Sequence, residues 1–354
     1  MKPNERSSFT AAIPVFHQLS QGPLDLWVDA CSSIYSLSPM DAHKAHTDYS
    51  VNAWHVDPLS IFDCTYEGMA TRHGNWHIEE SGAQIHVHKY SYGRASVETS
   101  GIPVECEAGA ITLLDYSRPF SALHTPSNCH SFFVPHSAIN YRPSDAHHSP
   151  VYSPDSTMGR MLEQEMDHLL GALKSGATDI HPADIRRFLG CVEVAVSPQQ
   201  ASSSARLEAR ESLKRSIMLF IEKNLLFEDL NVNLILQSFG VSRASLYRLF
   251  ADVDGVRTYI SRRRLYHAVT ELADAPTQRG KVHEVAQKWG FSSDPNFNRT
   301  VKREFGVTPG SLFEMPVPRS NEINEISPVH ILMNKLGRHP DPAQQRREPA
   351  RSAL

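Results

Sequence analysis

Long apolar runs are missing from this chain of 354 residues. No stretch of about 18 consecutive apolar residues occurs, so the sequence offers no candidate for a membrane-spanning helix. The opening sequence, MKPNERSSFTAAIPVF, also lacks the apolar core that a secretory signal peptide requires. These two absences predict a cytoplasmic protein with no membrane partner.

Cysteine is sparse, and its pattern argues against a framework of disulfides. Five cysteines are scattered along the chain without a CxxC pair: Cys31, Cys64, Cys106, Cys129 and Cys191. Because their number is odd and their spacing irregular, we expect free thiols in a reducing compartment. The chain also lacks a phosphate-binding glycine loop, paired carboxylates and a neighbouring nucleophile and base. We therefore expect no catalytic residues, no cofactor and no enzymatic activity.

The net charge of -4 conceals an uneven distribution of charge along the chain. Residues 1–204 hold 12 basic and 22 acidic side chains, a net charge of -10. Residues 205–315 hold 17 basic and 13 acidic side chains, a net charge of +4. Because DNA attracts a basic segment and repels an acidic one, the first part should lie away from any bound duplex.

One pattern occurs twice between Leu230 and Phe313. Each copy has a short apolar segment that ends in glycine, then a hydrophobic residue, a serine and a second helical segment. In the first copy, Gly240 can take the left-handed conformation that ends a helix, and Ser242 can cap the next one. The apolar side chains of that helix share one face: Leu246, Leu249 and Phe250. The opposite face carries Arg243, Ala244, Tyr247 and Arg248.

The second copy repeats the turn with Gly290. Asp294 can cap the helix that follows, and Pro295 suits its first position. Phe297 and Val301 form the buried stripe. The outward face carries Asn296, Arg299, Lys302 and Arg303. Two helices joined by a tight turn, with a cap opening the second helix, describe a helix-turn-helix.

The segment between the two copies predicts one continuous helix from Val256 to Asp274. At 1.5 Å per residue, such a helix is about 28 Å long. Successive major-groove faces of DNA lie about 34 Å apart. A single subunit is therefore expected to present two recognition helices to one side of a duplex.

The doubled motif resembles the AraC/XylS family of bacterial transcription regulators. The matching residues run from Gly240 to Pro309 in the order and spacing of that family: Gly240-Val241-Ser242-Arg243, Leu246, Arg248, Phe250, Gly255, Arg264-Leu265, Ala268, Val285-Ala286, Gly290-Phe291-Ser292, Phe297, Arg299, Lys302, Phe305-Gly306 and Thr308-Pro309. Three positions depart from the usual pattern, Leu236, Val301 and Glu314, and none of them removes a reading side chain.

The resemblance implies a sequence-specific regulator that binds double-stranded DNA and recruits RNA polymerase, usually as an activator and often as a homodimer. Its base-reading positions correspond here to Ala244, Tyr247, Arg248, Asp294, Pro295, Asn296 and Arg299. Arginine grips guanine and asparagine grips adenine, although either arginine can instead anchor a phosphate or a carboxylate. Side chains better suited to phosphate are Ser242, Arg243, Ser245, Ser292, Asn298 and Lys302.

Residues 21–150 show short strand patterns broken by glycine, proline, serine and asparagine. The strand candidates include LSIFDCTYEG, NWHIEE, AQIHVHKY, GAITLLDY and SFFVP. The segment from Glu107 to Asp115, followed by Arg118-Pro119, resembles the cupin-type, jelly-roll-like effector-binding domain of one branch of the family. The predicted fold class is therefore α+β, with an N-terminal barrel and an all-α C-terminal domain of two helix-turn-helix motifs joined by a linker helix.

The remaining segments complete the expected domain order. Residues 1–20 are expected to form a loose arm, and residues 151–196 a helical hairpin with two apolar stripes. The stripes either pair two subunits or bury against their own barrel. Residues 197–205 predict a polar linker, residues 206–315 the DNA-binding domain and residues 316–354 a disordered tail.

His86 and His88 lie two residues apart on an expected strand, so both side chains point to one face. Cupin enzymes bind a metal with such a pair and a nearby glutamate, but the next glutamate here, Glu98, is too distant, so we expect no metal. The histidines are then either ordinary hydrogen-bonded residues or part of an effector pocket. The candidates for that pocket are Trp54, Tyr66, Trp76, His86 and His88, since apolar walls with a few polar groups suit a small organic ligand.

Three hypotheses follow. The first is a regulator whose DNA binding responds to a small organic effector in the barrel. The second is a regulator without a ligand, controlled by its abundance or by a protein partner. The third is a cupin-type metal enzyme fused to a DNA-binding domain, against which the spacing after the histidine pair argues.

Overall fold

The computed structural model describes residues 10–16, 28, 31–39, 49–143, 149–276 and 278–314. The chain divides into two units, Met1–Ser216 and Ile217–Leu354, and the division falls inside the helix α5 (Ser203–Lys223). Within the described ranges, no helix has the length and apolar character needed to span a bilayer. The predicted tail, residues 316–354, lies outside these ranges.

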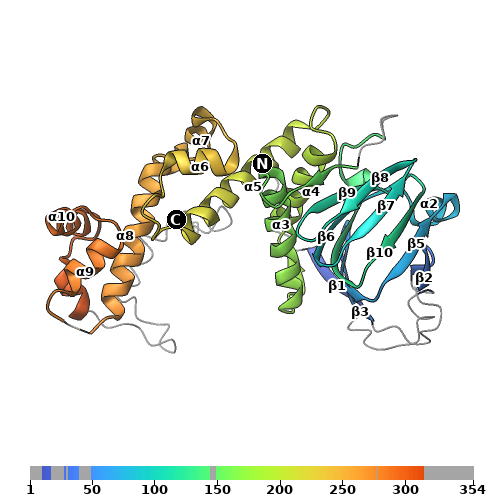
Figure 1. Ribbon diagram of the computed structural model, residues 1–354. Helices are drawn as coiled ribbons and strands as arrows, with labels where there is room; N and C mark the ends of the chain where they lie inside the picture. Colours follow the sequence, from blue (N-terminus) through green and yellow to red (C-terminus); the bar gives the residue numbers. More distant parts are fainter. Residues whose placement is uncertain are drawn as a thin grey trace, which may run out of the picture. The chain divides into compact units, whose positions relative to one another are not determined.

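The first unit is built on two sheets whose strand pairs are antiparallel (Figure 1). The larger sheet has eight strands in the order β12-β9-β6-β11-β4-β3-β1-β13, and the smaller has five in the order β2-β5-β10-β7-β8. In chain order the strands are β1 (Thr10–Phe16), β2 (Ser36–Pro39), β3 (Tyr49–Val56), β4 (Leu59–Tyr66), β5 (Met69–His73), β6 (Gln84–Tyr92), β7 (Ala95–Thr99), β8 (Ile102–Cys106), β9 (Ile111–Asp115), β10 (Phe120–His124), β11 (Ser127–Pro135), β12 (Val151–Tyr152) and β13 (Asp179–Ile180).

Side chains that alternate along these strands create a core on each face of the larger sheet. One core lies between the two sheets, where Phe133 and Tyr66 of the larger sheet share a cluster with Val97 and Ala122 of the smaller. We call this space the sandwich interior. The other core lies under two helices, α3 (Thr157–Lys174) and α4 (Pro182–Val196), which cover the outer face of the larger sheet (Figure 1).

The predicted cupin-type barrel is not closed. Each sheet has two free ends in its strand order, and no strand pair joins one sheet to the other among the described residues. The edge strands β12 and β13 contain two residues each, so they are too short to continue the hydrogen-bonded ladder into the smaller sheet. The two sheets are instead joined by the apolar core between them, as in a sandwich.

One predicted strand is a helix. The sequence NWHIEE belongs to α2 (Asn75–Ser81), which begins after Gly74. The Gly74 N–H donates to Nδ1 of His77 at 2.9 Å, which satisfies one backbone donor at the start of the helix. In this helix the Trp76 side chain is 55% exposed, whereas that of His77 is buried.

The helical hairpin uses both of its apolar stripes within the chain. The stripes pack in one cluster with Val87 and Phe132 of the larger sheet. The stripe residues are Met161, Leu162, Met166, Leu169, Leu170 and Leu173 on α3, and Ile185, Phe188, Cys191, Val192 and Ala195 on α4. The structure therefore shows the stripes buried against their own β domain, and the pairing of two subunits stays a prediction.

Two segments expected to be loose contain regular structure. Within residues 1–20, Thr10–Phe16 forms β1 and pairs with β3 and β13, while residues 1–9 and 17–20 lie outside the described ranges. Within residues 197–205, the last three residues already belong to α5. The buried carboxylate of Glu193 accepts hydrogen bonds from the N–H groups of Asn140 and Ser202 and so ties this turn to α4.

The second unit is helical. Its elements are α6 (Val232–Phe239), α7 (Arg243–Leu249), the 3-10 turn η2 (Ala251–Val253), α8 (Val256–Asp274), α9 (Lys281–Lys288), α10 (Asp294–Phe305) and the 3-10 turn η3 (Pro309–Glu314). The pair α6–α7 precedes the long helix α8, and the pair α9–α10 follows it (Figure 1). Phe239, Phe250 and Phe297 are among the largest fully buried side chains, so each helix pair has an aromatic anchor in the core.

Candidate nucleic-acid interface and effector site

The first helix pair is joined by the turn that the sequence predicts. Gly240 has a φ of +56°, in the left-handed region where glycine has no steric penalty. Ser242 is the N-cap of α7, and its hydroxyl accepts a hydrogen bond from the N–H of Ser245 at 3.1 Å. Leu246 and Leu249 of α7 are buried, which turns the opposite face of the helix to solvent.

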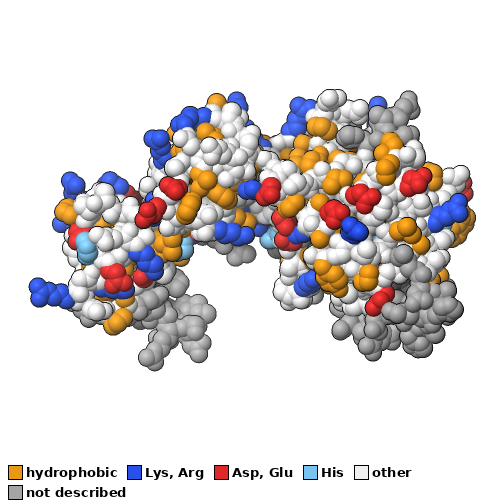
Figure 2. All heavy atoms as spheres, viewed as in Figure 1, with side chains coloured by type: hydrophobic (Ala, Val, Ile, Leu, Met, Phe, Trp, Pro, Cys, Tyr) orange, Lys and Arg blue, Asp and Glu red, His pale blue; other side chains and the backbone are white. Residues whose placement is uncertain are grey.

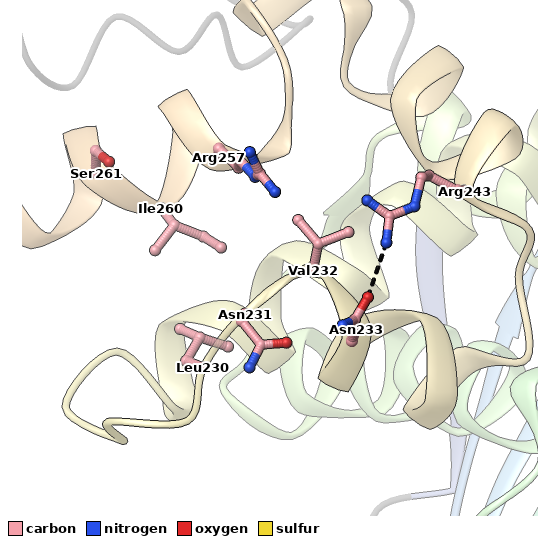
Figure 3. A pocket seen from close by; sticks show the side chains of 8 residues that line it. All are labelled: Leu230, Asn231, Val232, Asn233, Arg243, Arg257, Ile260 and Ser261. Atoms are coloured by element: carbon pink, nitrogen blue, oxygen red, sulfur yellow. Dashed lines mark hydrogen bonds between the residues drawn. The ribbon is translucent and has the colours of Figure 1, made fainter.

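That exposed face of α7 carries the predicted reading residues. Ala244 and Arg248 are exposed, and Tyr247 is 39% exposed despite its large aromatic ring. Arg248 donates to the Ser245 hydroxyl at 3.4 Å. The Arg243 guanidinium lies at the start of the helix and donates to Oδ1 of Asn233 at 2.8 Å (Figure 3).

The second helix pair has the same turn with a different cap. Gly290 has a φ of +75°, and a Cβ at this position would lie 3.1 Å from Nη1 of Arg264. The N-cap of α10 is Ser293, whose hydroxyl accepts from the N–H of Asn296 at 3.4 Å. The predicted cap, Asp294, is instead the first residue of the helix, so the capping prediction is off by one residue.

Asp294 has a different partner. Nδ1 of His283, on α9, donates to the Asp294 carboxylate at 2.8 Å. The side chain of His283 is 57% exposed and that of Asp294 is 42% exposed, so both remain at the surface. A carboxylate that already accepts from a histidine has less capacity to accept from a base.

The other predicted residues of α10 lie on its exposed face. Pro295, Asn296 and Arg299 are exposed, while Phe297 and Val301 are buried beneath them. The candidate phosphate ligands of this pair are also exposed: Ser292, Asn298 and Lys302. Basic side chains appear on the surface over α7 and around α10 (Figure 2).

The three consecutive arginines of α8 are engaged inside the unit. Arg262 donates to Asp254 at 2.7 Å, and Arg263 donates to the Glu222 carboxylate of α5. Nε of Arg264 donates to the backbone oxygen of Leu225 at 3.0 Å. Two of the three arginines are therefore paired with acidic side chains of the same unit.

The structure separates the five predicted effector-site residues. Trp54 packs in the core beneath α3 and α4, and Trp76 is exposed on α2. Tyr66, His86 and His88 instead lie in or beside the sandwich interior. Residues far apart in space cannot contact one small ligand, so only these three of the five candidates remain close enough to share a site.

His86 and His88 are buried without hydrogen-bond partners. Both ring nitrogens of both residues lack a partner among the described residues. Burial, together with the neighbouring histidines, lowers the pKa of His86, and it lowers the pKa of His88 to about 3, so both rings are neutral. The His86 ring stacks on that of Phe133 with centroids 4.4 Å apart, and the His88 ring lies edge-on to Tyr90.

A third histidine, which the sequence did not single out, lies nearby. The ring nitrogens of His124 lie 3.1 Å from the Tyr90 hydroxyl and 3.0 Å from the Thr71 hydroxyl. Burial lowers the pKa of His124 to about 4. Its strand, β10, belongs to the smaller sheet, so no spacing along the sequence relates it to His86. No group of three or more metal-ligating side chains is placed to hold a metal within the described ranges.

Comparison with known proteins gives two family matches. Residues 33–189 match a family described as an AraC-binding-like domain, and residues 235–315 match one described as a helix-turn-helix domain. The probable transcription factor PqrA of Proteus vulgaris is 29% identical over 107 residues, which cover 29% of this chain and 85% of that protein. The transposon Tn10 TetD protein of Escherichia coli is 31% identical over 118 residues, which cover 33% of this chain and 78% of that protein.

One further curated relative and one solved structure are also similar to this chain. The regulatory protein SoxS of Salmonella typhimurium is 32% identical over 84 residues, which cover 23% of this chain and 76% of that protein. Among solved structures, the AraC-like transcriptional activator CuxR is 20% identical, with a TM-score of 0.43, and the match covers 69% of this chain and 90% of that one. The three curated relatives thus match a third of this chain or less, yet that part accounts for three quarters or more of each relative.

Proposed function

Because the chain belongs to the AraC/XylS family of DNA-binding transcription regulators, we propose that it reads one duplex through α7 and α10. The observation that carries this proposal is the repetition of one arrangement. Each of the two helices buries its apolar face and exposes an arginine, Arg248 or Arg299, at the matching position. The helix α8 between the pairs has 19 residues and hence a length of about 28 Å, which suits successive major grooves.

The residues that we assign to base reading are the exposed ones on each outward face. In the first pair these are Ala244, Tyr247 and Arg248, and in the second Pro295, Asn296 and Arg299. Arg248 and Arg299 suit guanine, and Asn296 suits adenine. Ala244 and Pro295 can offer only apolar contact and shape. For Asp294 we propose a positioning role, because its carboxylate is held by His283.

Mapping of bound sites across a genome, followed by selection from random duplexes, tests this proposal. The expected site has two half-sites about one helical turn apart, read by one subunit. Full-length protein that prefers no sequence over random DNA at physiological salt would refute it. Transcription of the genes beside the mapped sites, measured with and without the protein, would show whether it activates or represses them. As a partner of chromosomal DNA the protein is expected to act in the cytoplasm.

We also propose that the N-terminal unit binds a small organic effector in the sandwich interior. The support is the pair His86 and His88, since two neutral imidazoles hold two donors and two acceptors without partners. Each unpaired buried group costs about 1–3 kcal/mol. Natural proteins keep such a cost where a function needs it. An uncharged effector with both donors and acceptors would satisfy these nitrogens.

A thermal-shift screen against small aromatic compounds, amines and amino acids tests the effector proposal, with His86→Leu as the matched variant. Leucine removes the unpaired nitrogens at similar volume, so the variant should be as stable as the native chain or more stable. It should also lose any ligand-induced shift. A ligand that stabilises both proteins equally would place the effector elsewhere, and the absence of any ligand would favour control by abundance or a protein partner.

Effector binding would act by shifting the population of the form that binds DNA. From the family resemblance we propose activation through RNA polymerase and a homodimeric state. Because the apolar stripes of α3 and α4 are buried in their own unit, a dimer would have to use other surfaces. Light scattering of the purified chain tests the dimer. The metal-enzyme alternative has no supporting observation, and metal analysis of the purified protein would reveal it.

A further inference from the structure

A pocket of about 350 Å³ opens where the first residues of α6, α7 and α8 meet (Figure 3). Arg243 of α7 and Arg257 of α8 both reach into this pocket, whose polar wall also holds Asn233 and Ser261. Ile260 contributes to its apolar base. Nothing in the linear pattern distinguishes Arg257 from the other arginines of the same helix.

The charge of this pocket has one sign. Of the residues that line it, none is acidic. Among the described residues Arg257 forms no ion pair or side-chain hydrogen bond, whereas Arg262 and Arg263 pair with carboxylates and Arg264 donates to a backbone oxygen. Arg243 uses one donor on Asn233, and a guanidinium has five. Two cationic forks facing one open pocket without a counter-charge form a site for an anion.

The backbone adds to this charge. The N-cap side chain of α6 serves only the N–H of Leu234, and α8 has no side-chain cap. Backbone N–H groups at the starts of both helices therefore remain available, and their partial positive charges support an anion. Neither helix end would constitute a site without the two arginines.

We propose that this pocket binds one backbone phosphate of the DNA duplex, with Arg257 and Arg243 as its charged donors. The proposal rests on the proposed DNA-binding function. The ligand is identified as a DNA phosphate because the pocket lies next to the face of α7 that is expected to enter the groove. Arg243 is the first residue of α7, and Ala244, the next residue, lies on the face expected to enter the groove. A phosphate in this pocket would fix the depth and register of α7 without reading a base.

The test uses the full-length chain and two duplexes, one that carries the selected site and one of random sequence. Affinity is measured over a series of salt concentrations. Arg257→Ala should weaken both complexes by a similar factor, about five- to tenfold near 0.1 M salt, and should lower the slope of log affinity against log salt by about one. The ratio of the two affinities should stay at its native value.

Three variants make the result specific. Arg257→Lys keeps the charge and should retain the native salt slope. Arg262→Ala removes an arginine from the same helix that is paired with Asp254 outside the pocket, and it should leave the slope unchanged. Arg248→Ala should instead change the base preference. Because both Arg257 and Arg262 lie at least partly in solvent, their substitution should leave the fold intact. Thermal unfolding of each variant checks this expectation.

An unchanged affinity and slope for Arg257→Ala, with normal binding by the native chain, would overturn the proposal while leaving the proposed function intact. A native chain that binds no duplex would overturn both. Inorganic phosphate provides the last arm. If it stabilises the native chain but not Arg257→Ala, and that variant binds DNA normally, the pocket serves a free anion and the DNA assignment is wrong.

Discussion

The two helix pairs follow one pattern, yet they differ at the positions where DNA would lie. In the first pair, Ser242 caps α7 and the arginines at the surface face no carboxylate on that helix. In the second pair, Ser293 caps α10 and Asp294 brings a negative charge to its first turn, where His283 holds it. The repeated sequence pattern therefore gives the same helix-turn-helix backbone twice. The charges on the exposed face differ between the two copies.

Two glutamates connect α8 to other helices of its unit. Glu222 of α5 accepts from Arg263 and His267 of α8. Glu271 of α8 accepts from Lys288 and from the indole of Trp289, next to α9. Glu222 connects α8 to α5, which belongs to neither helix pair. Glu271 connects α8 directly to α9, a helix of the second pair.

The largest expected effect breaks the scaffold of each pair. Phe250→Ala and Phe297→Ala each remove a ring with no exposed surface, so each should cost about 3–5 kcal/mol of unfolding free energy. Chemical denaturation of the full chain, followed by circular dichroism, measures the loss. Tyr247→Ala, on the exposed face of α7, is the matched control and should change stability by less than about 1 kcal/mol.

The next effect compares reading between the pairs. Arg248→Ala and Arg299→Ala should each weaken binding to the selected site by about 1–3 kcal/mol and relax the preference at one base position in its own half-site. Selection from random duplexes measures both changes. If the base preference of either variant is unaltered, that arginine does not read a base and its contact is with the phosphate backbone.

The contacts of Glu271 predict that the stability of the fold depends on pH. Burial alone would raise the pKa of Glu271, but hydrogen bonds from Lys288 and Trp289 bring this pKa below its ordinary value of 4.5. A lowered folded-state pKa contributes stability above pH 4.5 that is lost as the pH falls through the folded value. Glu271→Gln should therefore cost about 1 kcal/mol at pH 7 and less at pH 4. Urea denaturation at both pH values measures this, and an equal cost at both would contradict the ionic contribution.

The smallest effect concerns Asp294. If its carboxylate positions His283 and does not read a base, Asp294→Asn should leave the base preference unchanged. Removal of a negative charge near the duplex should raise affinity for every sequence about two- to threefold. A changed preference at one base position would show that Asp294 reads DNA after all.

Much of the helical unit could be predicted from the sequence because its signals are local. Gly240 and Ser242 mark a turn and a cap within a few residues, and the predicted linker helix matches α8 at both ends. The error at Asp294 has a local cause as well, since Ser293 beside it is an equally good cap. Because Asp294 does not cap the helix, its carboxylate can accept a hydrogen bond from His283, eleven residues earlier in the chain. Capping rules consider only neighbouring residues, so they do not predict this contact.

The β unit was harder to predict because its contacts join distant strands. Trp54 and Tyr66 were grouped with the histidines on chemistry, yet the alternation along β3 and β4 directs them to opposite faces of one sheet. Whether the sheets close into a barrel depends on which strands form the edges, and the edge strands β12 and β13 come from segments with only two residues in register. Strand length at an edge leaves little trace in composition.

By itself the sequence determined the two helix pairs, their turns and their exposed arginines, because glycine, serine caps and apolar spacing act over one or two helical turns. Only the tertiary structure decided that the sheets form an open sandwich, that two histidines inside it have no hydrogen-bond partner in the described part of the chain, and that Arg257 meets Arg243 across a pocket. These features depend on which segments pack together, and that choice is made by the burial of the whole core rather than by any one stretch of chain.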